Sequence, residues 1–258
     1  MKVVILCGGL GTRLKEETEF RPKPMVYVGN RPILWHIMKI YAYYGFKDFV
    51  LALGYKGEMI KEYFNHYELM NNDMTIELGK PENNIVHQNH NECGWRITLA
   101  DTGEKTLKGG RLKKIEKYID GDDFMVTYGD GVGNINIPAL LKFHKNHGKM
   151  VTVTGVMPPM SRFGKLKIHQ NNSAFFMEKP PEESFINGGF FVFNKKVFKY
   201  LDEDDNCDLE AGILEKLSKQ KQVKVHKHNG FWGCMDTLRD TEYLNKLWNE
   251  GNAKWKIW

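Results

Sequence analysis

The sequence predicts an α/β fold: a doubly wound, mostly parallel (mixed) sheet flanked by helices, with a small β-rich extension. Strand-like and helix-like patterns alternate from the N-terminus onward, which is typical of a parallel sheet with helices on both faces. Several strand-like runs are continuously apolar, as expected for strands that are buried on both sides. No flexible linker divides the chain, so residues 1–258 are expected to form one domain.

The first part of the chain carries most of the alternation. Strands are expected at residues 2–7, 49–53, 95–100, 124–128 and 150–157, and helices at 32–44, 56–64, 111–119 and 138–146. Proline at position 32 suits the first turn of its helix, because proline has no N–H to leave unpaired there. The stretch 71–94 is polar and poorly periodic, and is expected to be an irregular excursion with one weak strand near 74–78.

Beyond Pro158 and Pro159 the strands become shorter. Strands are expected at residues 165–168, 175–177, 189–193 and 223–226, and helices at 196–201, 209–219 and 238–250. We expect these elements to extend or cap the same sheet.

Composition and charge exclude several classes of protein. The net charge is +5 and basic residues are interleaved with acidic ones, so no nucleic-acid-binding tail is expected, although the positive balance suits a polyanionic small substrate. No apolar run approaches ~18 residues, and no signal-peptide pattern opens the chain. The four cysteines are widely spaced, as expected for reduced thiols in a cytoplasmic protein.

The segment after the first predicted strand has the composition of a phosphate-binding loop. Gly8, Gly9 and Gly11 allow main-chain N–H groups to approach an anion, and Arg13 can clamp free phosphates. The Walker lysine is missing, and so is the third glycine of the dinucleotide fingerprint, which disfavours a nicotinamide oxidoreductase. An ordinary glycine turn with a solvated arginine is the alternative.

Two further residues strengthen the phosphate interpretation. Lys23 stands between Pro22 and Pro24, and an extended, stiff backbone there would fix the origin of a long cationic side chain. Asp130 follows an apolar strand and is flanked by Gly129 and Gly131, which suits a Mg²⁺ ligand beside phosphates. A proline-rich connector and a turn aspartate are the respective alternatives.

Gly8–Arg13 followed by Pro22-Lys-Pro24 resembles the loop of the sugar-1-phosphate nucleotidyltransferases. Similar motifs continue along nearly the whole chain, at residues 32–38, 54–57, 101–103, 109–111, 127–131, 162–164, 178–180, 186–191, 230–232 and 235–240. Each motif is weakly specific, but their order and spacing together make the resemblance strong. It is strongest to members that transfer a cytidylyl group to glucose 1-phosphate, and it extends to the tail at residues 253–256.

The resemblance implies a Rossmann-like nucleotidyltransferase (glycosyltransferase-A-like) fold and a Mg²⁺-dependent reaction. In that reaction CTP and α-D-glucose 1-phosphate would give CDP-glucose and pyrophosphate, for surface-polysaccharide precursors such as those of lipopolysaccharide. Residues 1–150 would mainly bind the nucleotide and residues 151–258 the sugar phosphate. The partners would be small-molecule substrates and further copies of the chain, with no nucleic acid and no membrane.

The resemblance also assigns individual residues. The nucleotide would be bound by Leu6, Cys7, Gly8, Gly9, Leu10, Gly11, Thr12, Arg13, Lys23, Thr106, Arg111 and Gly129. The sugar phosphate would be bound by Glu178, Lys179, Asn187 and Gly188, and Mg²⁺ by Asp130 and Asp236. Arg13, Lys23, Asp130 and Lys179 would be the catalytic residues.

Some assignments compete with simpler ones. Asp236 or Thr237 is placed to cap the helix predicted from residue 238, so the metal role of Asp236 comes from the resemblance alone. His144 and His147 are spaced like zinc ligands, but we expect them on a solvated helix face. Gly212, Ile213, Gly233 and Cys234 depart from the family pattern in the acceptor half, which leaves another acceptor open. No side chain can be assigned to the cytosine edge, so another nucleoside triphosphate is open as well. A catalytically silent nucleotide-binding regulatory subunit is the alternative from another class.

Overall fold

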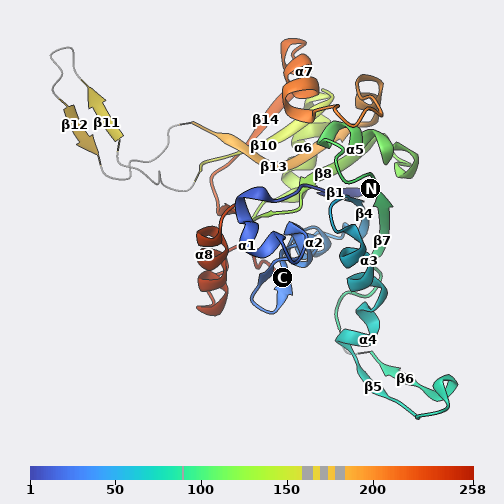
Figure 1. The fold of residues 1–258 in the computed structure, drawn as a ribbon. Helices are drawn as coiled ribbons and strands as arrows, with labels where there is room; N and C mark the ends of the chain where they lie inside the picture. The colour runs from blue at the N-terminus through green and yellow to red at the C-terminus, as the bar shows by residue number, and fades with distance from the viewer. Residues whose placement is uncertain (89, 159–164, 169–173, 178–183) are drawn as a thin grey trace.

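A seven-stranded mixed sheet forms the centre of the molecule, in the order β14-β10-β13-β8-β1-β4-β7 (Figure 1). The computed structural model describes residues 1–88, 90–158, 165–168, 174–177 and 184–258. The strands of the sheet are β1 (Val3–Cys7), β4 (Asp48–Leu53), β7 (Arg96–Asp101), β8 (Asp123–Tyr128), β10 (Val151–Val156), β13 (Ile186–Asn194) and β14 (Val223–His228). Only β13 of these runs antiparallel to its neighbours, β8 and β10, so the predicted mixed, mostly parallel sheet is confirmed.

Strand β1 shows why this sheet must be covered on both faces. All five of its residues are buried, and it pairs in parallel with β4 on one side and β8 on the other. Val3, Ile5 and Cys7 face one core, whereas Val4 and Leu6 face the other. This alternation follows from the two-residue period of a strand, and the apolar residues at every position reflect two buried faces.

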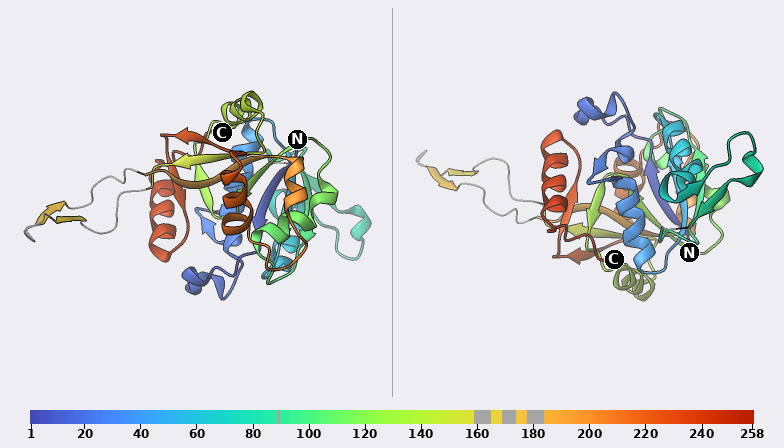
Figure 2. Two further views of the ribbon diagram at one scale, coloured as in Figure 1. Left: turned by 90° about the horizontal axis from the view of Figure 1, so that it is seen from above. Right: turned by 90° about the horizontal axis from the view of Figure 1, so that it is seen from below.

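Helices cover both faces (Figure 2). The first core contains side chains from helices α2 (Ile33–Tyr43), α3 (Gly57–Asn65), α6 (Ile137–His147) and α8 (Leu238–Asn249). The second core contains side chains from α5 (Lys108–Lys114), a π-helical segment at Leu209–Leu214 and α7 (Glu215–Lys219). The doubly wound arrangement is therefore confirmed. Among the described residues, no helix combines the length and apolar character that crossing a bilayer requires.

The remaining elements are short. Helices α1 (Lys15–Thr18) and α4 (Tyr67–Asn71) are single turns, and 3-10 turns lie at Thr12–Leu14, Lys23–Met25, Pro81–Asn83, Glu116–Tyr118 and Lys195–Tyr200. Two-stranded sheets are formed by β2 (Tyr27–Val28) with β3 (Arg31–Pro32), β5 (Asp73–Thr75) with β6 (Ile85–His87), β9 (Gly131–Gly133) with β15 (Trp232–Cys234), and β11 (Lys165–Ile168) with β12 (Ala174–Met177).

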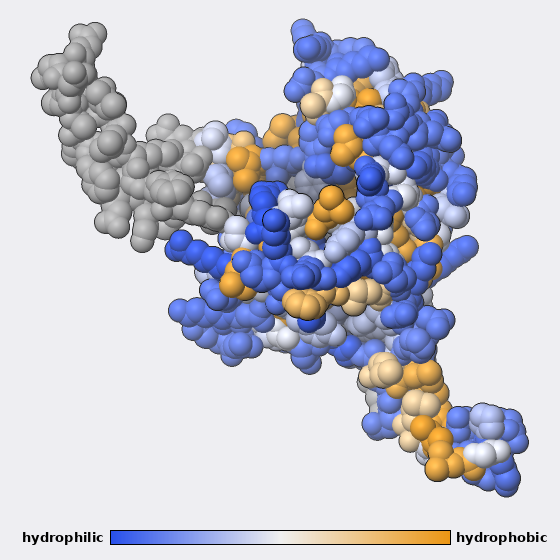
Figure 3. All heavy atoms as spheres, viewed as in Figure 1, coloured by the Kyte–Doolittle hydropathy of each residue, from blue (hydrophilic) through white to orange (hydrophobic). Residues whose placement is uncertain are grey.

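The excursion at 71–94 is a projecting hairpin with two strands rather than the single strand predicted. Strand β5 pairs with β6 in antiparallel register, and the hairpin extends from α4 away from the sheet (Figure 1). Met70 is 78% exposed and Leu78 is 92% exposed, and Ile76 and Ile85 are exposed as well. They give this arm a hydrophobic surface (Figure 3).

Two helices differ from the prediction, one in its bounds and the other in its type of helical winding. The helix expected at 111–119 begins earlier, at Lys108, and ends at Lys114. Its start is held by the segment 204–207: the Leu107 N–H donates to the Asp205 oxygen at 2.7 Å and the Gly110 N–H to the Cys207 oxygen at 3.1 Å, which satisfies main-chain donors that a helix start leaves unpaired. Gly109 and Gly110 let this segment approach, because a Cβ would lie 2.7 Å from the oxygen of Cys207 and 2.6 Å from that of Asp204. The helix expected at 209–219 begins as the π-helical segment.

Candidate active site

The candidate site lies where the chain reverses its direction across the sheet. From β1 the chain adds β4 and β7 on one side and then places β8 on the other. Ligands of open α/β sheets bind beyond the carboxyl ends of the strands at such a switch point. A cleft of ≈ 1270 Å³ opens there. This exceeds the ~300–1,000 Å³ that is typical of a pocket for one small molecule.

Most of the predicted site residues converge on this cleft. Those that line it are Leu6, Cys7, Gly8, Gly9, Gly11, Thr12, Arg13, Lys23, Thr106, Arg111, Gly129, Asp130, Asn187, Gly188 and Asp236. Leu10 is outside the lining and is exposed. Glu178 and Lys179 lie outside the described residues, as do the motifs at 162–164 and 178–180.

The glycine loop presents unpaired main-chain donors. Within the described part of the chain, the N–H groups of Gly9, Leu10 and Gly11 donate to no other residue, so they are free to bind anionic oxygens. Gly11 has φ +63°, a left-handed conformation that favours glycine, and it leads into the 3-10 turn Thr12–Leu14. Leu6 and Cys7 are buried, and burial raises the pKa of the Cys7 thiol far above its ordinary range.

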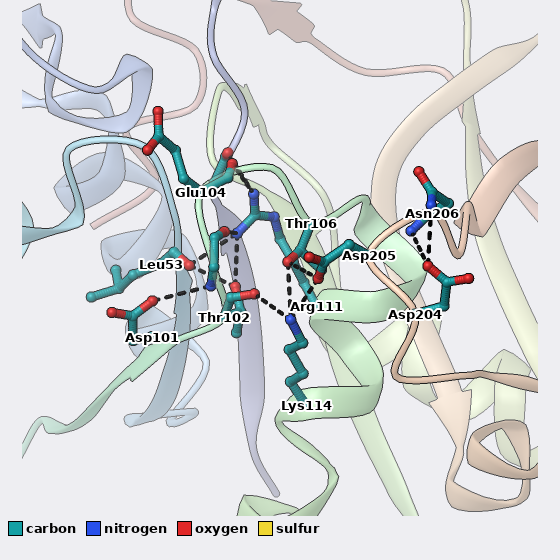
Figure 4. A network of polar contacts seen from close by, with 12 residues as sticks. Leu53, Asp101, Thr102, Glu104, Thr106, Arg111, Lys114, Asp204, Asp205 and Asn206 are labelled. Carbon is teal, nitrogen blue, oxygen red and sulfur yellow. Dashed lines mark hydrogen bonds and ion pairs between the residues drawn. The ribbon is translucent and has the colours of Figure 1, made fainter.

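Arg111 is hydrogen-bonded to this loop through the main-chain oxygen of Gly8, and Figure 4 shows the polar network around its guanidinium. Its guanidinium is buried and donates to the main-chain oxygens of Leu53, Gly103, Gly8 and Glu104 and to the Thr102 hydroxyl, at 2.7–3.0 Å. A Cβ on Gly8 would lie 2.0 Å from Cζ of Arg111, so only glycine fits above it. The same guanidinium therefore ties the glycine loop to the ends of β4 and β7.

Thr106 is joined to this network. Its hydroxyl donates to Asp205 at 2.5 Å, and Lys114 donates to both side chains. Thr106 is thus buried at the wall of the cleft, and its hydroxyl proton is already donated to Asp205.

Replacing Arg111 by methionine is expected to destabilise the fold by about 3 kcal/mol or more. Methionine leaves several buried oxygens without a donor, and each unsatisfied buried polar group costs about 1–3 kcal/mol. Urea unfolding measures the effect. Lys113→Met on the same helix is the control, because Lys113 is partly exposed and makes two contacts, an ion pair with Glu116 and a long hydrogen bond of 3.3 Å to the Phe198 oxygen, so its loss should cost only about 1 kcal/mol. Equal losses in the two variants would contradict the supporting role of Arg111.

Lys23 bridges two carboxylates that are far apart in the chain. Its Nζ lies 2.6 Å from Oδ2 of Asp130 and 2.6 Å from Oδ1 of Asp236. Arg13 approaches the other oxygen of Asp236 at 3.0 Å, from a side chain that is 73% exposed. The loop of β1, the loop of β8 and the segment before α8 thus meet at one ammonium group.

The electrostatics of this cluster follow from its geometry. Burial acts to lower the pKa of Lys23, but the two carboxylates outweigh it and hold the pKa above the ordinary value. Burial acts to raise the pKa of Asp236, but the hydrogen bond and charge of Lys23, together with Arg13, hold it below the ordinary range. At neutral pH the site therefore contains a charged lysine beside a charged Asp236.

Lys23 is held differently from the prediction. Pro22 is extended, with ψ 147°, but Lys23 itself opens the 3-10 turn Lys23–Met25, closed by the Met25 N–H to the Pro22 oxygen at 2.8 Å. The expectation of an extended backbone at Lys23 was therefore wrong. Gly129 packs against this turn, and a Cβ there would lie 2.8 Å from Pro24 Cγ.

Thr237, rather than Asp236, caps helix α8. The Thr237 side chain accepts from the N–H of Asp240, and the Asp240 side chain accepts in return from the N–H of Thr237. This capping box leaves the carboxylate of Asp236 to face the cleft. The competing cap assignment for Asp236 was therefore wrong.

The two bridged carboxylates fit a magnesium site. Because one ammonium group reaches both at 2.6 Å, a single cation near the same position is within reach of both. Mg²⁺ prefers oxygen ligands and is commonly held by one or two carboxylates together with substrate phosphates and water. No set of three or more metal-binding side chains occurs among the described residues.

His144 and His147 form no metal site either. They are not on a solvated face as expected: His144 is buried, and both ring systems bond the Thr152 hydroxyl, at 2.8 and 2.7 Å. The helix α6 packs this side against β10, which the spacing of the two histidines does not reveal.

Residues of β13 and β15 build another wall of the cleft. Asn187 donates from Nδ2 to the Tyr128 hydroxyl at 2.8 Å and accepts from the N–H of Gly189 at 2.9 Å. Trp232 donates to the main-chain oxygen of Gly188 at 2.8 Å. Tyr128 and Trp232 line the cleft but were not assigned from the sequence, although both lie in the family-like motifs 127–131 and 230–232.

Cys234, one of the departures from the family pattern, lies beside the carboxylates. Its Sγ is 3.9 Å from Asp236, and burial together with the charges of Asp236 and Asp130 raises the pKa of its thiol to about 12. All four cysteines are free thiols.

Iodoacetamide at pH 8 is therefore expected to modify the exposed Cys93 well before Cys234. With a pKa of about 12, only about one Cys234 thiol in 10,000 is ionised at that pH, and the thiolate is the reactive form. The rate at Cys234 should rise as pH approaches 12. Peptide mass spectrometry of timed samples measures both rates, and equal rates at pH 8 would contradict the prediction.

Sequence and structure comparisons show which known proteins this chain is similar to. Residues 2–249 match the family model described as nucleotidyl transferase. The chain is 47% identical over 260 residues to glucose-1-phosphate cytidylyltransferase of Salmonella typhimurium and 45% identical over 258 residues to the probable glucose-1-phosphate cytidylyltransferase of Bacillus subtilis, each alignment covering 100% of both chains. A putative glucose-1-phosphate thymidylyltransferase structure from Bacillus anthracis has the same fold, with TM-score 0.69 and 21% identity over 98% of this chain and 95% of that one.

Proposed function

The chain belongs to the nucleotidyl transferase family, and we propose that it transfers the cytidylyl group of CTP to α-D-glucose 1-phosphate, giving CDP-glucose and pyrophosphate. Two full-length relatives, 47% and 45% identical, carry this activity in their names. The observation that carries the proposal is the ammonium of Lys23 between Asp130 and Asp236, beside a loop of unpaired N–H groups.

In the proposed reaction a phosphate oxygen of the sugar 1-phosphate attacks the α-phosphorus of CTP. The new P–O bond forms as the bond to the β-phosphate breaks, and pyrophosphate leaves with the electron pair. Because both reactants are anions, unit charges ~4 Å apart repel by about 4 kcal/mol at an effective dielectric of ~20. The site must therefore supply positive charge and positioning more than proton transfer. No covalent enzyme intermediate is required.

Different residues of the cleft would bind the triphosphate and the metal ion. The N–H groups of Gly9, Leu10 and Gly11 would hold triphosphate oxygens, and Arg13 and Lys23 would neutralise their charge. Asp130 and Asp236 would hold Mg²⁺. Bound there, Mg²⁺ would polarise a phosphoryl oxygen as a Lewis acid.

The acceptor would bind on the side of β13. Asn187 and Gly188 would lie along the sugar, together with Glu178. Lys179 would hold the acceptor phosphate, an assignment that comes from the family resemblance. In this scheme residues 1–150 mainly bind the nucleotide and residues 151–258 mainly the sugar phosphate, with Asp236 as the exception that joins the two. We propose the cytoplasm as the place of this reaction and nucleotide-sugar synthesis for surface polysaccharides as its purpose.

A pyrophosphate-release assay tests the proposed function. The four nucleoside triphosphates are crossed with several sugar 1-phosphates in the presence of Mg²⁺, and CTP with glucose 1-phosphate is expected to give the highest kcat/KM. A higher value for another pair would reassign the substrates within the same chemistry. Binding of CTP without turnover of any acceptor would instead favour a silent regulatory subunit.

We also propose that the chain forms a homo-oligomer through the arm that carries β5 and β6. Leu78, Met70 and Ile76 expose large apolar side chains there, and contiguous exposed apolar surface is typical of protein–protein contacts (Figure 3). Light scattering after size exclusion is expected to show a multimer that Leu78→Asp weakens. A monomeric wild-type protein would contradict this proposal.

A further inference from the structure

The hydroxyl of Tyr128 connects the two halves of the cleft. Tyr128 ends strand β8, and its Oη lies 2.5 Å from Oε1 of Glu210 and 2.8 Å from Nδ2 of Asn187. A carboxylate can only accept, so the single phenolic proton goes to Glu210. The phenol oxygen must then accept from Asn187. The pair Tyr128–Glu210 therefore determines which end of the Asn187 amide is the donor.

The other end of the amide agrees with this direction. The N–H of Gly189 donates to Oδ1 of Asn187 at 2.9 Å. Both ends of the amide are thus held, and a flip by 180° would break both contacts. Among the described residues Nδ2 donates only to Tyr128, and since each of its two protons serves one partner, its second N–H is left for a bound molecule.

Tyr128 itself is clamped from three sides. Lys108, at the start of α5, is ion-paired with Glu210, and its Nζ lies 4.9 Å from the centre of the Tyr128 ring. Gly189 has φ +76°, and a Cβ there would lie 2.6 Å from Cδ2 of Tyr128, so the ring packs directly on glycine. Phe191 contacts the ring edge-on, with centroids 5.7 Å apart.

We propose that Tyr128 and Glu210 are positioning residues for the acceptor: they hold the Asn187 amide so that its free N–H meets an oxygen of the sugar 1-phosphate. The inference rests on the proposed function, which places the acceptor beside Asn187. Tyr128 and Glu210 act through Asn187, whereas in the proposed function the triphosphate would be held by the glycine loop, Arg13 and Lys23. Their loss must therefore affect the acceptor and leave the nucleotide bound as before.

Steady-state kinetics of Tyr128→Phe and Glu210→Gln test this, with both substrates varied. Phenylalanine keeps the ring and removes only the hydroxyl. The expected result is a KM for glucose 1-phosphate raised about fivefold to tenfold, as for the loss of one oriented hydrogen bond, with the KM for CTP changed less than about twofold. Adding Asn187→Ala to Tyr128→Phe should raise the acceptor KM no further than Asn187→Ala alone, because the two residues act as one unit.

Tyr200→Phe is the matched control. Tyr200 also has a lysine over its ring, Lys216 at 5.5 Å, but lies outside the cleft lining. Its variant should leave both KM values unchanged.

The outcomes separate this inference from the function it rests on. A wild-type chain that turns over no sugar 1-phosphate overturns the proposed function and the inference with it. Wild-type turnover with an unchanged acceptor KM in Tyr128→Phe, or with equal rises in both KM values, overturns the inference alone. Calorimetric titration with CTP confirms that each variant is folded.

Discussion

Asp130→Asn is expected to lower kcat/KM by about 1000-fold while the protein folds normally. Asparagine has the same shape but no charge, so it is a poor ligand for Mg²⁺. Losing metal stabilisation of about 4 kcal/mol in the transition state corresponds to three factors of ten in rate. Pyrophosphate release at saturating and limiting Mg²⁺ measures the change.

The structure explains why the fold should tolerate this change. The main-chain oxygen of Asp130, which accepts from the N–H of Met235 at 2.9 Å, is unaffected by the substitution. Asp120→Asn is the matched control. Asp120 precedes the N-terminal end of β8, whereas Asp130 follows the C-terminal end, and the side chain of Asp120 is 74% exposed. Activity within tenfold of wild type in Asp130→Asn, with an unchanged Mg²⁺ requirement, would rule out the metal role.

The central sheet was predictable from the sequence because its signals are local. The all-apolar run Val3–Cys7, and the similar runs in β4 and β8, report burial on both faces within five or six consecutive residues. The start of helix α6 also has a local signal, because Asn136 caps it and a proline lies in its first turn.

Features that depend on tertiary contacts were not predictable. The early start of α5 depends on hydrogen bonds from Leu107 and Gly110 to the segment 204–207, nearly 100 residues away. Strand β6 consists of three exposed residues, Ile85–His87, and pairs only with β5, so no buried face imposes a period on it.

The site shows the same division. Gly8–Arg13, Lys23 and Asp130 carry local signals, namely glycines, flanking prolines and a strand end. The meeting of Lys23 with Asp236 spans 213 residues, and near Asp236 the local signal was a helix cap, which Thr237 supplies. The link from Tyr128 to Glu210 has no local signal, because a tyrosine at a strand end and a glutamate in a helix are each ordinary.

Lys23→Gln is expected to lower kcat/KM by about 100-fold or more and to make the stability of the protein depend on Mg²⁺. A donor aimed at developing phosphate charge is worth about 10²–10³ in rate. The carboxylate oxygens of Asp130 and Asp236 that face Lys23 lie at most 5.2 Å apart, twice their 2.6 Å distance from Nζ. Without the ammonium these charges repel, by about 3 kcal/mol at an effective dielectric of ~20.

Thermal unfolding in EDTA at pH 8 measures that repulsion. Partial exposure of both carboxylates reduces it to about 2 kcal/mol, which for a domain of this size lowers Tm by about 4–8 °C. Saturating Mg²⁺ should restore most of the loss, and should raise Tm less in wild type, where it competes with the ammonium for the same oxygens.

Lys39→Gln separates this effect from the general loss of a buried lysine. Lys39 pairs with Glu92 outside the cleft, and its side chain is 13% exposed, as is that of Lys23. It should lose stability too, because Glu92 is left buried without its cation, but Mg²⁺ should not restore it. The same Mg²⁺-induced rise in Tm in wild type and Lys23→Gln would mean that the ammonium and the metal do not share these carboxylates. A larger rise in Lys23→Gln alone places Lys23 where the metal binds and makes its release from Asp130 and Asp236 part of loading the site.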